Sequence, residues 1–445
     1  MKLWDKGTKM NQNVENFTVG KDRELDLQLA PFDVLGSLAH CKMLASIGLL
    51  ESEELALVEK ELQKIFTGIE KGDFEIEEGI EDVHSQVEYL LTQTLGDVGK
   101  KIHSGRSRND QVLLDLKLFT RHQIEQVVNE AKALFDLLIE NSEKYKGALI
   151  PGYTHLQVAM PSSFGLWFGA YAEALADDLS LLQAAFKMVD QNPLGSGAGY
   201  GSSFPLNRQM TTDLLGFENL NYNVVYAQMG RGKMEFAVVS ALSNIAYTIG
   251  KLAMDACLYN SQNFGFISFA DEFTTGSSIM PHKKNPDVFE LVRARANSLQ
   301  VLPTQIQSVS SNLPSGYHRD YQLIKEFFMP AFDQLISCLE MTKTMLSNVK
   351  LNESLLDDER YQYLFTVEMV NELVLKGVPF RDAYKEVGAL VESGKFKFEG
   401  DLKHQHEGSI GNLCNAQIKS KLEKTLEAFN FEKIDQAYQN LLGRS

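Results

Sequence analysis

Residues 238–259 read VVSALSNIAYTIGKLAMDACLY. The apolar residues of this stretch recur in alternating steps of four and three, at Val238, Leu242, Ile245, Ile249, Leu252, Ala256 and Tyr259. Such spacing puts them on one face of an α-helix with a period near 3.5 residues, which is typical of nearly parallel helices that pack side by side. The stretch therefore predicts a long helix inside a bundle.

Two other stretches, 109–138 and 164–189, carry apolar residues at similar steps. Helices of ~25–30 residues would be ~40 Å long at 1.5 Å per residue, so we expect an elongated bundle. Residues 324–345 form a fourth candidate, in which Pro330 predicts a kink or a late start. Periodicity alone leaves open the alternative of several ordinary short helices.

The residues before and after the predicted bundle show shorter helical patterns than the bundle itself. Residues 34–49 and 53–66 predict shorter helices separated by glycines, and the chain after about residue 352 returns to short helical patterns. We therefore predict a mainly α protein of three domains: residues 1–108, a central long-helix domain at 109–352, and a small helical domain at 353–445.

The composition narrows the class of protein. The 445 residues include 43 Lys and Arg against 59 Asp and Glu, a net charge of −16, which argues against nucleic acid or an anionic membrane as the main partner. The four cysteines are far apart and predict neither disulfides nor a zinc cluster. Residues 1–6 lack the apolar core of a signal peptide, and the apolar run 236–250 is shorter than the ~20 residues of a membrane span, so we expect a cytoplasmic protein.

One stretch, TGSSIMPHKKNPD at 275–287, combines a flexible start with a helix start. Asn285 suits a helix cap and Pro286 the first helical position, so Lys283 and Lys284 would lie beside free backbone N–H groups. Positive side chains at the positive end of a helix dipole predict an anion site. The alternative is a solvated connection.

Two further clusters precede predicted helices. HSGRSRND at 103–110 places Arg106 and Arg108 just before Asn109 and Asp110, which we expect to cap the next helix. GYTHLQ at 152–157 supplies His155, a natural proton donor or acceptor at neutral pH, although a lone histidine is more often structural.

Two other motifs give weaker evidence of function. The glycine run at 195–201 lacks the dinucleotide-binding spacing and predicts a close backbone turn. His404 and His406 resemble a metal pair, but in a polar tail we expect them to be solvated.

Together these clusters resemble one family. GSSIMPHKKNP at 276–286 is similar to the signature loop of the fumarase/aspartase superfamily. HSGRSRNDQ at 103–111, GYTHLQ at 152–157 and VPFRDA at 378–383 resemble the argininosuccinate lyase family within it. The resemblance implies a homotetramer whose active sites lie where three subunits meet. It also implies cleavage of argininosuccinate to arginine and fumarate, in arginine biosynthesis, with no metal or organic cofactor.

The resemblance assigns roles to residues. Ser277 would abstract a proton, His155 would protonate the departing nitrogen, Glu290 would orient His155, and Lys283 would stabilise the developing negative charge. The substrate contacts carried over are Arg108, Asn109, Thr154, Asn285, Tyr317, Gln322 and Lys325. Asp82, His84 and Arg106 would support the site. Which of Ser277 and His155 is the acid stays open.

Several positions depart from the family pattern. Gly20 stands where a substrate-binding serine is usual, and Val158 and Met160 replace a polar pair. These departures leave open a different N-substituted aspartate as substrate. A binding or structural protein that has lost activity on the same scaffold is a third alternative, against which the intact Ser277 and His155 argue.

Overall fold

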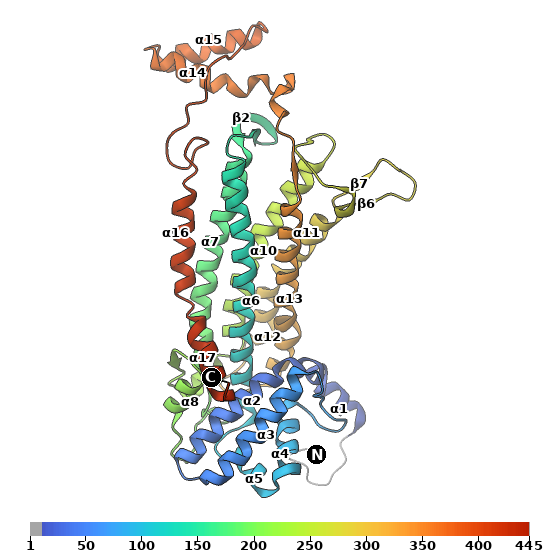
Figure 1. The fold of residues 1–445 in the computed structure, drawn as a ribbon, viewed down its shortest axis with the longest axis vertical. Helices are drawn as coiled ribbons and strands as arrows, with labels where there is room; N and C mark the ends of the chain where they lie inside the picture. The colour runs from blue at the N-terminus through green and yellow to red at the C-terminus, as the bar shows by residue number, and fades with distance from the viewer. Residues whose placement is uncertain (1–10, 445) are drawn as a thin grey trace.

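The computed structural model describes residues 11–444 and is mainly α-helical. A tall helix bundle stands on a base of shorter helices and carries a small pair of helices at its far end (Figure 1). The long helices of the bundle are α6 (Arg108–Lys144), α7 (Phe164–Val189), α10 (Lys233–Asn260) and α13 (Asp320–Ser347), with α11 (Asp287–Leu299), α12 (Leu302–Ser310) and α16 (Asn415–Glu427) against them.

The predicted long helices are confirmed, and the alternative of several short ones is wrong. In α10 six of the periodic positions are buried, each at most 1% exposed: Val238, Leu242, Ile245, Ile249, Leu252 and Ala256. They face α7, α11, α12 and α13, which pack around α10. The periodic face is therefore the core of the bundle.

Helix α10 is longer than the apolar run that the sequence suggested. By length and composition its 28 residues suffice to cross a membrane, but 61% of its most apolar window is buried inside the bundle. Core helices of soluble proteins have the same length and composition, and α10 occupies that position here.

The base is built from α2 (Asp22–Ser46), α3 (Ser52–Glu70), α4 (Val83–Leu95) and α5 (Asp97–Lys100). Helix α2 begins twelve residues before the predicted start and runs through Pro31, and α13 likewise begins early and contains Pro330. The predicted late starts were wrong. Pro330 is exposed, so the carbonyl that loses its helical partner can bond to water.

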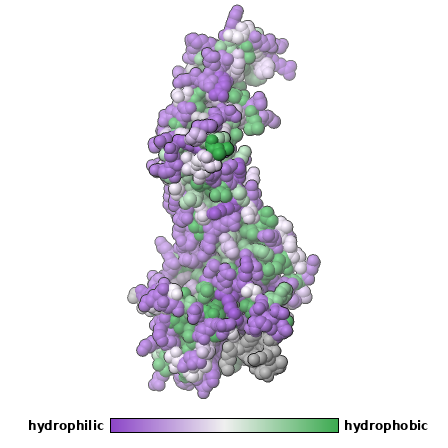
Figure 2. Space-filling view, turned by 90° about the vertical axis from the view of Figure 1, so that its right-hand side faces the viewer, coloured by the Kyte–Doolittle hydropathy of each residue, from purple (hydrophilic) through white to green (hydrophobic). Residues whose placement is uncertain are grey.

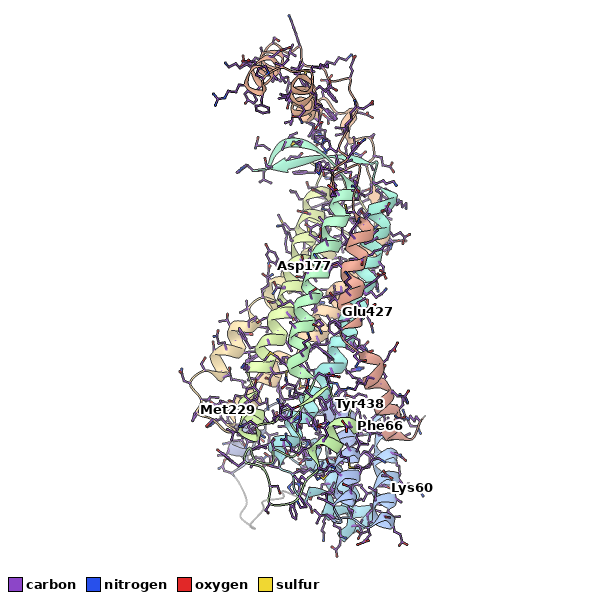
Figure 3. All side chains as sticks on the ribbon, turned by 90° about the vertical axis from the view of Figure 1, so that its left-hand side faces the viewer. Lys60, Phe66, Asp177, Met229, Glu427 and Tyr438 are labelled. Carbon is purple, nitrogen blue, oxygen red and sulfur yellow. The ribbon has the colours of Figure 1, made fainter. Side chains whose placement is uncertain are left out.

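The C-terminal segment has two parts. Helices α14 (Thr366–Leu375) and α15 (Phe380–Glu392) share a small core of their own at the far end of the bundle. Helix α16 then descends beside α7, and α17 (Phe431–Leu442) packs on α2 and α8 (Arg208–Leu214) at the base (Figure 3).

Two predicted helix starts needed correction. Ser107, not Asn109, caps α6: its Oγ accepts from the Asn109 N–H at 3.3 Å, and Asp110 completes the cap by accepting from the Ser107 N–H at 2.8 Å. Pro286, not Asn285, takes the cap position of α11, and Asn285 ends a strand instead.

The glycine run forms the predicted backbone turn around Asp110. Gly195, Gly197, Gly199 and Gly201 all have positive φ. The N–H groups of Gly195 and Gly197 donate to Asp110 Oδ2 at 3.0 and 2.8 Å, which anchors the start of α6.

Two protruding segments complete the fold. A hairpin of β1 (Leu149–Thr154) and β2 (Gln157–Ser163) follows α6 at the far end of the bundle, and a loop closed by β6 (Thr275–Gly276) and β7 (Lys284–Asn285) projects from its side (Figure 1). Both carry motifs that the sequence singled out.

Candidate active site

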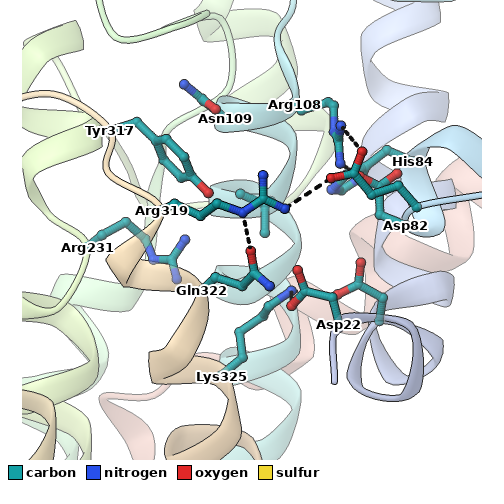
Figure 4. A pocket seen from close by; sticks show the side chains of 13 residues that line it. Asp22, Asp82, His84, Arg108, Asn109, Arg231, Tyr317, Arg319, Gln322 and Lys325 are labelled. Carbon is teal, nitrogen blue, oxygen red and sulfur yellow. Dashed lines mark hydrogen bonds and ion pairs between the residues drawn. The ribbon is translucent and has the colours of Figure 1, made fainter. Parts of the chain in front are cut away.

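A polar cavity of about 180 Å³ lies where the base meets the bundle (Figure 4). It is formed by α2, α4 and the N-terminal ends of α6 and α13. Its wall consists mainly of charged and amide side chains: Asp22, Asp26, Glu81, Asp82, His84, Arg108, Asn109, Val112, Arg231, Tyr317, Arg319, Gln322 and Lys325.

Seven predicted site residues line this one cavity. They come from the first turn of α6, from the cap and first turn of α4, and from the start of α13 with the loop before it. The seven are Asp82, His84, Arg108, Asn109, Tyr317, Gln322 and Lys325. Segments more than 200 residues apart in the sequence thus meet because α13 packs against α6 and α2.

Lys325 is a deeply buried cation of the cavity, paired with two carboxylates. Its side chain is 5% exposed, and its Nζ lies 2.6 Å from Asp22 Oδ1 and 2.8 Å from Asp26 Oδ1. Burial raises the pKa of Asp22 to about 6 although Lys325 opposes the shift, and Asp26 adds to it. Burial alone would lower the pKa of Lys325, but the two carboxylates raise it, so the lysine is charged.

A second charged group lies across the cavity. The Arg108 guanidinium contacts Glu81 Oε2 at 3.1 Å and also Asp82, while Arg319 Nη2 contacts Glu81 Oε1 at 3.2 Å. Burial works to raise the pKa of Asp82, but His84 and Arg108 outweigh it and hold this pKa below its usual value. The wall is therefore ionised at neutral pH, with both signs side by side.

Gln322 ties the N-terminal segment to the cavity. Its Nε2 donates to the carbonyl oxygens of Thr18 and Val19 at 2.9 and 3.1 Å, at the end of α1 (Gln12–Val19). Gly20 follows with φ of +53°, and a Cβ there would lie 3.9 Å from Gln322 Nε2. The residue that departs from the family pattern thus lies beside the predicted substrate contact.

Five charged residues of the wall were not among the predicted site residues. Asp22 and Asp26 stand four residues apart on one face of α2, Glu81 precedes the predicted Asp82, and Arg319 precedes α13. Buried Arg231 donates from Nε to Glu235 at 2.8 Å and from Nη2 to the Tyr321 carbonyl at 2.9 Å. The spacing of Asp22 and Asp26 was a usable signal, whereas nothing local distinguishes Arg231 from other arginines.

His155 and Thr154 lie on the hairpin, far from this cavity. Thr154 pairs with Gln157, so His155 and Leu156 are the two central residues of a tight turn, with φ of 54° and 58°. Neither is glycine, so the turn is strained, and Leu156 is 74% exposed. Helix α6 separates the hairpin from Arg108, and its 37 residues span about 55 Å.

Ser277, Lys283 and Asn285 lie on the projecting loop. Ser277 Oγ accepts from the Met280 N–H at 3.2 Å, Asn285 Nδ2 donates to Thr275 at 3.4 Å, and Lys283 is exposed. Glu290 is exposed on α11, with its Oε1 4.0 Å from Arg293. Within one chain, Glu290 therefore has an arginine rather than His155 as its neighbour.

Arg106 is set apart from both protrusions and from the cavity wall. It is buried, and its Nη1 donates to Ser37 Oγ at 3.0 Å. The other predicted residues, apart from Glu290 on α11, fall into three places: the cavity, the hairpin and the projecting loop.

One group of side chains has the spacing that a metal ion would need. Among residues 11–444 it consists of Asp33, His84 and Asp115, whose ligand atoms lie within 4.8 Å of one another. His84 Nδ1 donates to Asp33 Oδ1 at 2.7 Å, so a proton already lies between two of the atoms that would bind a metal ion. His404 and His406, which we expected to be solvated, are not in such a group: His406 is exposed, whereas His404 is half-buried and its Nε2 contacts Glu368 at 2.8 Å.

Comparisons with known proteins place the chain in a family. The family model described as lyase matches residues 2–301. The argininosuccinate lyase of Bacteroides fragilis is 64% identical over 443 residues, which cover 100% of this chain and 99% of that protein. The argininosuccinate lyase of Thermotoga neapolitana is 39% identical over 389 residues, covering 87% and 97%.

Solved structures share the architecture. An EDDS lyase variant with bound fumarate matches with a TM-score of 0.77 at 20% identity, over 98% of this chain and 96% of that chain. A class II fumarase from Schistosoma mansoni matches with a TM-score of 0.72 at 15% identity, over 95% and 94%. The fold is thus shared with proteins that are only 15–20% identical to this chain. The identity to the two argininosuccinate lyases is much higher, at 64% and 39%. The chain belongs to the argininosuccinate lyase family.

Proposed function

We propose that this protein cleaves argininosuccinate into arginine and fumarate, the last step of arginine biosynthesis. The observation that carries the proposal is the full-length identity of 62–64% to Bacteroides, Parabacteroides and Phocaeicola proteins named argininosuccinate lyase. The cavity supports it, because a substrate with three carboxylates, an ammonium and a guanidinium group needs a wall that offers both signs of charge.

The reaction breaks the bond between a guanidino nitrogen and a carbon of the succinyl group. A base removes a proton from the neighbouring carbon, the electron pair forms the double bond of fumarate, and the nitrogen leaves with a proton. We assign the base to Ser277 and the acid to His155, with Glu290 orienting His155. Lys283 and Asn285 stabilise the doubly charged carboxylate that develops beside the carbon that loses its proton.

We propose that the substrate is held by the cavity and by the two protrusions together. Arg108, Asn109, Tyr317, Gln322 and Lys325 would contribute from the cavity, and Thr154 from a hairpin. A helix of about 55 Å keeps the hairpin and the cavity of one chain apart, so different subunits must supply them.

We therefore propose a cytoplasmic homotetramer in which three subunits contribute to each active site. Large apolar side chains are exposed along α10, α11 and α13, including Tyr247, Met254, Leu291 and Met341. Patches of hydrophobic residues also interrupt the hydrophilic surface in Figure 2. Exposed apolar surface of this kind supports association with further copies of the chain.

The test is fumarate release from argininosuccinate by the purified protein, followed as a rise in ultraviolet absorbance. Ser277→Ala should lower kcat by about 10²–10⁴-fold because the proton-abstracting group is lost. Ser278→Ala, on the neighbouring residue of the same loop, is the matched control and should retain activity. The wild-type protein releasing no fumarate at high concentration would refute the proposal.

A second candidate keeps the elimination but changes the substrate to another N-substituted aspartate. Gly20 favours it, since it removes a serine side chain beside Gln322. A panel of N-substituted aspartates separates the two candidates: argininosuccinate gives the highest kcat/KM if the first is right.

A further inference from the structure

Behind the cavity lies a buried cluster that the proposed reaction has not yet used. His84 lines the cavity, whereas Asp33 of α2 and Asp115 of α6 lie behind it and do not line it. His84 Nδ1 is 2.7 Å from Asp33 Oδ1 and 3.4 Å from Asp115 Oδ2. Their exposed fractions are 5% for His84, 2% for Asp33 and 1% for Asp115, so water does not screen the group.

The two carboxylates have few other partners. Asp33 Oδ2 and Asp115 Oδ2 are buried and accept no hydrogen bond from residues 11–444. The nearest other cation, Arg106, donates to Ser37 instead. Buried carboxylates persist only beside compensating positive charge, and the His84 ring is the group placed to supply it.

The second ring nitrogen of His84, Nε2, is therefore available to bond to a ligand in the cavity. Nδ1 is engaged by Asp33, and no described residue bonds to Nε2. A histidine whose Nδ1–H is held by a carboxylate has a fixed ring orientation. When the ring is also protonated, its Nε2–H is a fixed donor for a carboxylate in the cavity.

We propose that Asp33 and Asp115 are positioning residues that hold His84 as an oriented cation, so that its Nε2–H binds a carboxylate of the substrate. This inference rests on the proposed function for the identity of the substrate, but not for the state of His84. Asp33 and Asp115 contribute from α2 and α6, and Asp82 at the cap of α4 adds a third negative charge that faces the ring.

The electrostatics agree with this geometry. Burial works to lower the pKa of His84, but Asp33, Asp115 and Asp82 together raise it to about 9. Burial and the nearby Asp33 raise the pKa of Asp115 well above its usual value, while His84 and Arg106 oppose the shift and Asp26 adds to it. The same groups that fix the ring thus keep it protonated across the neutral range.

The test combines a histidine titration with a pH profile in the full-length enzyme. With ¹³Cε1-labelled histidine, the resonance lost in His84→Asn identifies His84 among the nine histidines. We expect it to titrate near pH 9 in the wild type and between pH 6 and pH 7 in Asp33→Asn, because Asp115 and Asp82 still oppose the effect of burial. In that variant kcat/KM for argininosuccinate should fall at least tenfold at pH 8.5 but less than threefold at pH 6, where the ring is still protonated.

One control variant and two further variants of the cluster complete the test. Asp178→Asn changes another largely buried carboxylate, which accepts from Thr248 in the bundle and does not line the cavity, and should leave both profiles unchanged. Asp115→Asn should lower the His84 titration in the same direction as Asp33→Asn. Asp33→Glu should restore part of the activity at pH 8.5.

Several results would overturn the proposal. A wild-type His84 that titrates below pH 7 would do so even if Asp33→Asn fails to fold. An Asp33→Asn enzyme with equal losses at pH 6 and 8.5 and an unchanged His84 titration would reduce the cluster to a structural role. Loss of activity on treatment with EDTA, restored by Mn²⁺ or Zn²⁺, would assign the cluster to a metal. A wild type that releases no fumarate refutes the proposed function, whereas the titration still tests the cluster.

Discussion

The hairpin turn at His155 and Leu156 is held in a backbone conformation that neither residue prefers. Left-handed φ at two consecutive non-glycine residues costs about 1–2 kcal/mol each, so the surrounding strands must hold the turn in place. The strain presents the imidazole at the tip of a rigid protrusion, where another subunit can receive it.

At Leu156 we predict opposite effects for two substitutions. Leu156→Gly should stabilise the protein by up to about 1 kcal/mol, because release of strain exceeds the entropic cost of glycine. Leu156→Val should destabilise it by about 1 kcal/mol, because a β-branched residue tolerates positive φ least. Urea midpoints at constant protein concentration measure both changes.

The control is the same glycine substitution in a helix. Leu181 is also exposed, at 44%, but lies within α7, so Leu181→Gly should destabilise by about 1 kcal/mol. A Leu156→Gly protein that is less stable than Leu156→Val would contradict the role of backbone strain.

Asp22 gives a prediction that depends on pH. Its pKa rises from 3.8 to about 6 on folding, so the folded state binds more protons than the unfolded state between these values, and stability falls as pH rises through this window. Above pH 6 the ionised carboxylate costs up to about 3 kcal/mol at 1.36 kcal/mol per pKa unit. Asp22→Asn should therefore stabilise the protein by about 1–3 kcal/mol at pH 8.

The gain of Asp22→Asn should shrink toward pH 4, because folded Asp22 is then protonated and unfolded Asp22, with a pKa of 3.8, is already partly protonated. Urea unfolding at pH 4.5 and pH 8 measures the difference. The same variant should raise KM for argininosuccinate, because a charged group of the cavity wall is lost. An equal gain at both pH values would show that Asp22 does not titrate in this window.

At the scale of elements, Arg121 of α6 holds the C-terminal helix to the base. The side chain is fully buried, donates from Nη2 to the Leu215 carbonyl at 3.0 Å, and lies 3.6 Å from Asp190. The guanidinium carbon is 4.3 Å from the centre of the Phe217 ring and 5.5 Å from that of Tyr438 of α17. Helix α17 thus packs, through Tyr438, on the Arg121 guanidinium, which also contacts the Phe217 ring.

Arg121→Met should destabilise the protein by about 2–4 kcal/mol, because it leaves a buried Asp190 without its cation and removes the contacts to α17. Thermal unfolding and limited proteolysis of the C-terminal helices measure the effect. Arg360→Met is the control: Arg360 is exposed and pairs with Asp358, so the change should cost much less stability than Arg121→Met. Equal losses in the two variants would contradict the docking role.

Helices were the elements most readily predicted, and their ends were the least. The periodic apolar positions of α10 determine a buried face whatever the helix packs against, so its existence follows from the local sequence. The starts of α2 and α13 did not follow, because the half-buried Pro31 and the exposed Pro330 are tolerated inside helices whose other face is buried by tertiary packing. Ser107 likewise caps α6 where Asn109 was expected, since Ser107, Asn109 and Asp110 are all suitable caps within four residues.

At the scale of the whole molecule, the separation of the three groups of site residues predicts complementation. In the proposed homotetramer, Arg108→Met would remove a cation of the cavity and Ser277→Ala the proposed base, so we expect each variant to be inactive alone. If each site takes these residues from different subunits, random reassembly from equal amounts gives about a quarter of sites with both residues intact.

The measurement is fumarate release after mild dissociation and reassembly of the mixed variants, with light scattering to establish that tetramers form. Reassembly of each variant with itself is the control and should stay inactive. A mixture that remains inactive although tetramers re-form would contradict sites shared between subunits.

The sequence by itself determined the helical class, the long central helices and the motifs that place the chain in its family, because helix periodicity and loop chemistry are local properties. Tertiary structure alone decided which charged residues share a cavity: Lys325 with Asp22, and Arg319 with Glu81, pair across segments whose spacing in the sequence carries no signal. It also decided that Arg108 and His155 lie at opposite ends of α6, since 37 helical residues cannot be bent to bring them together.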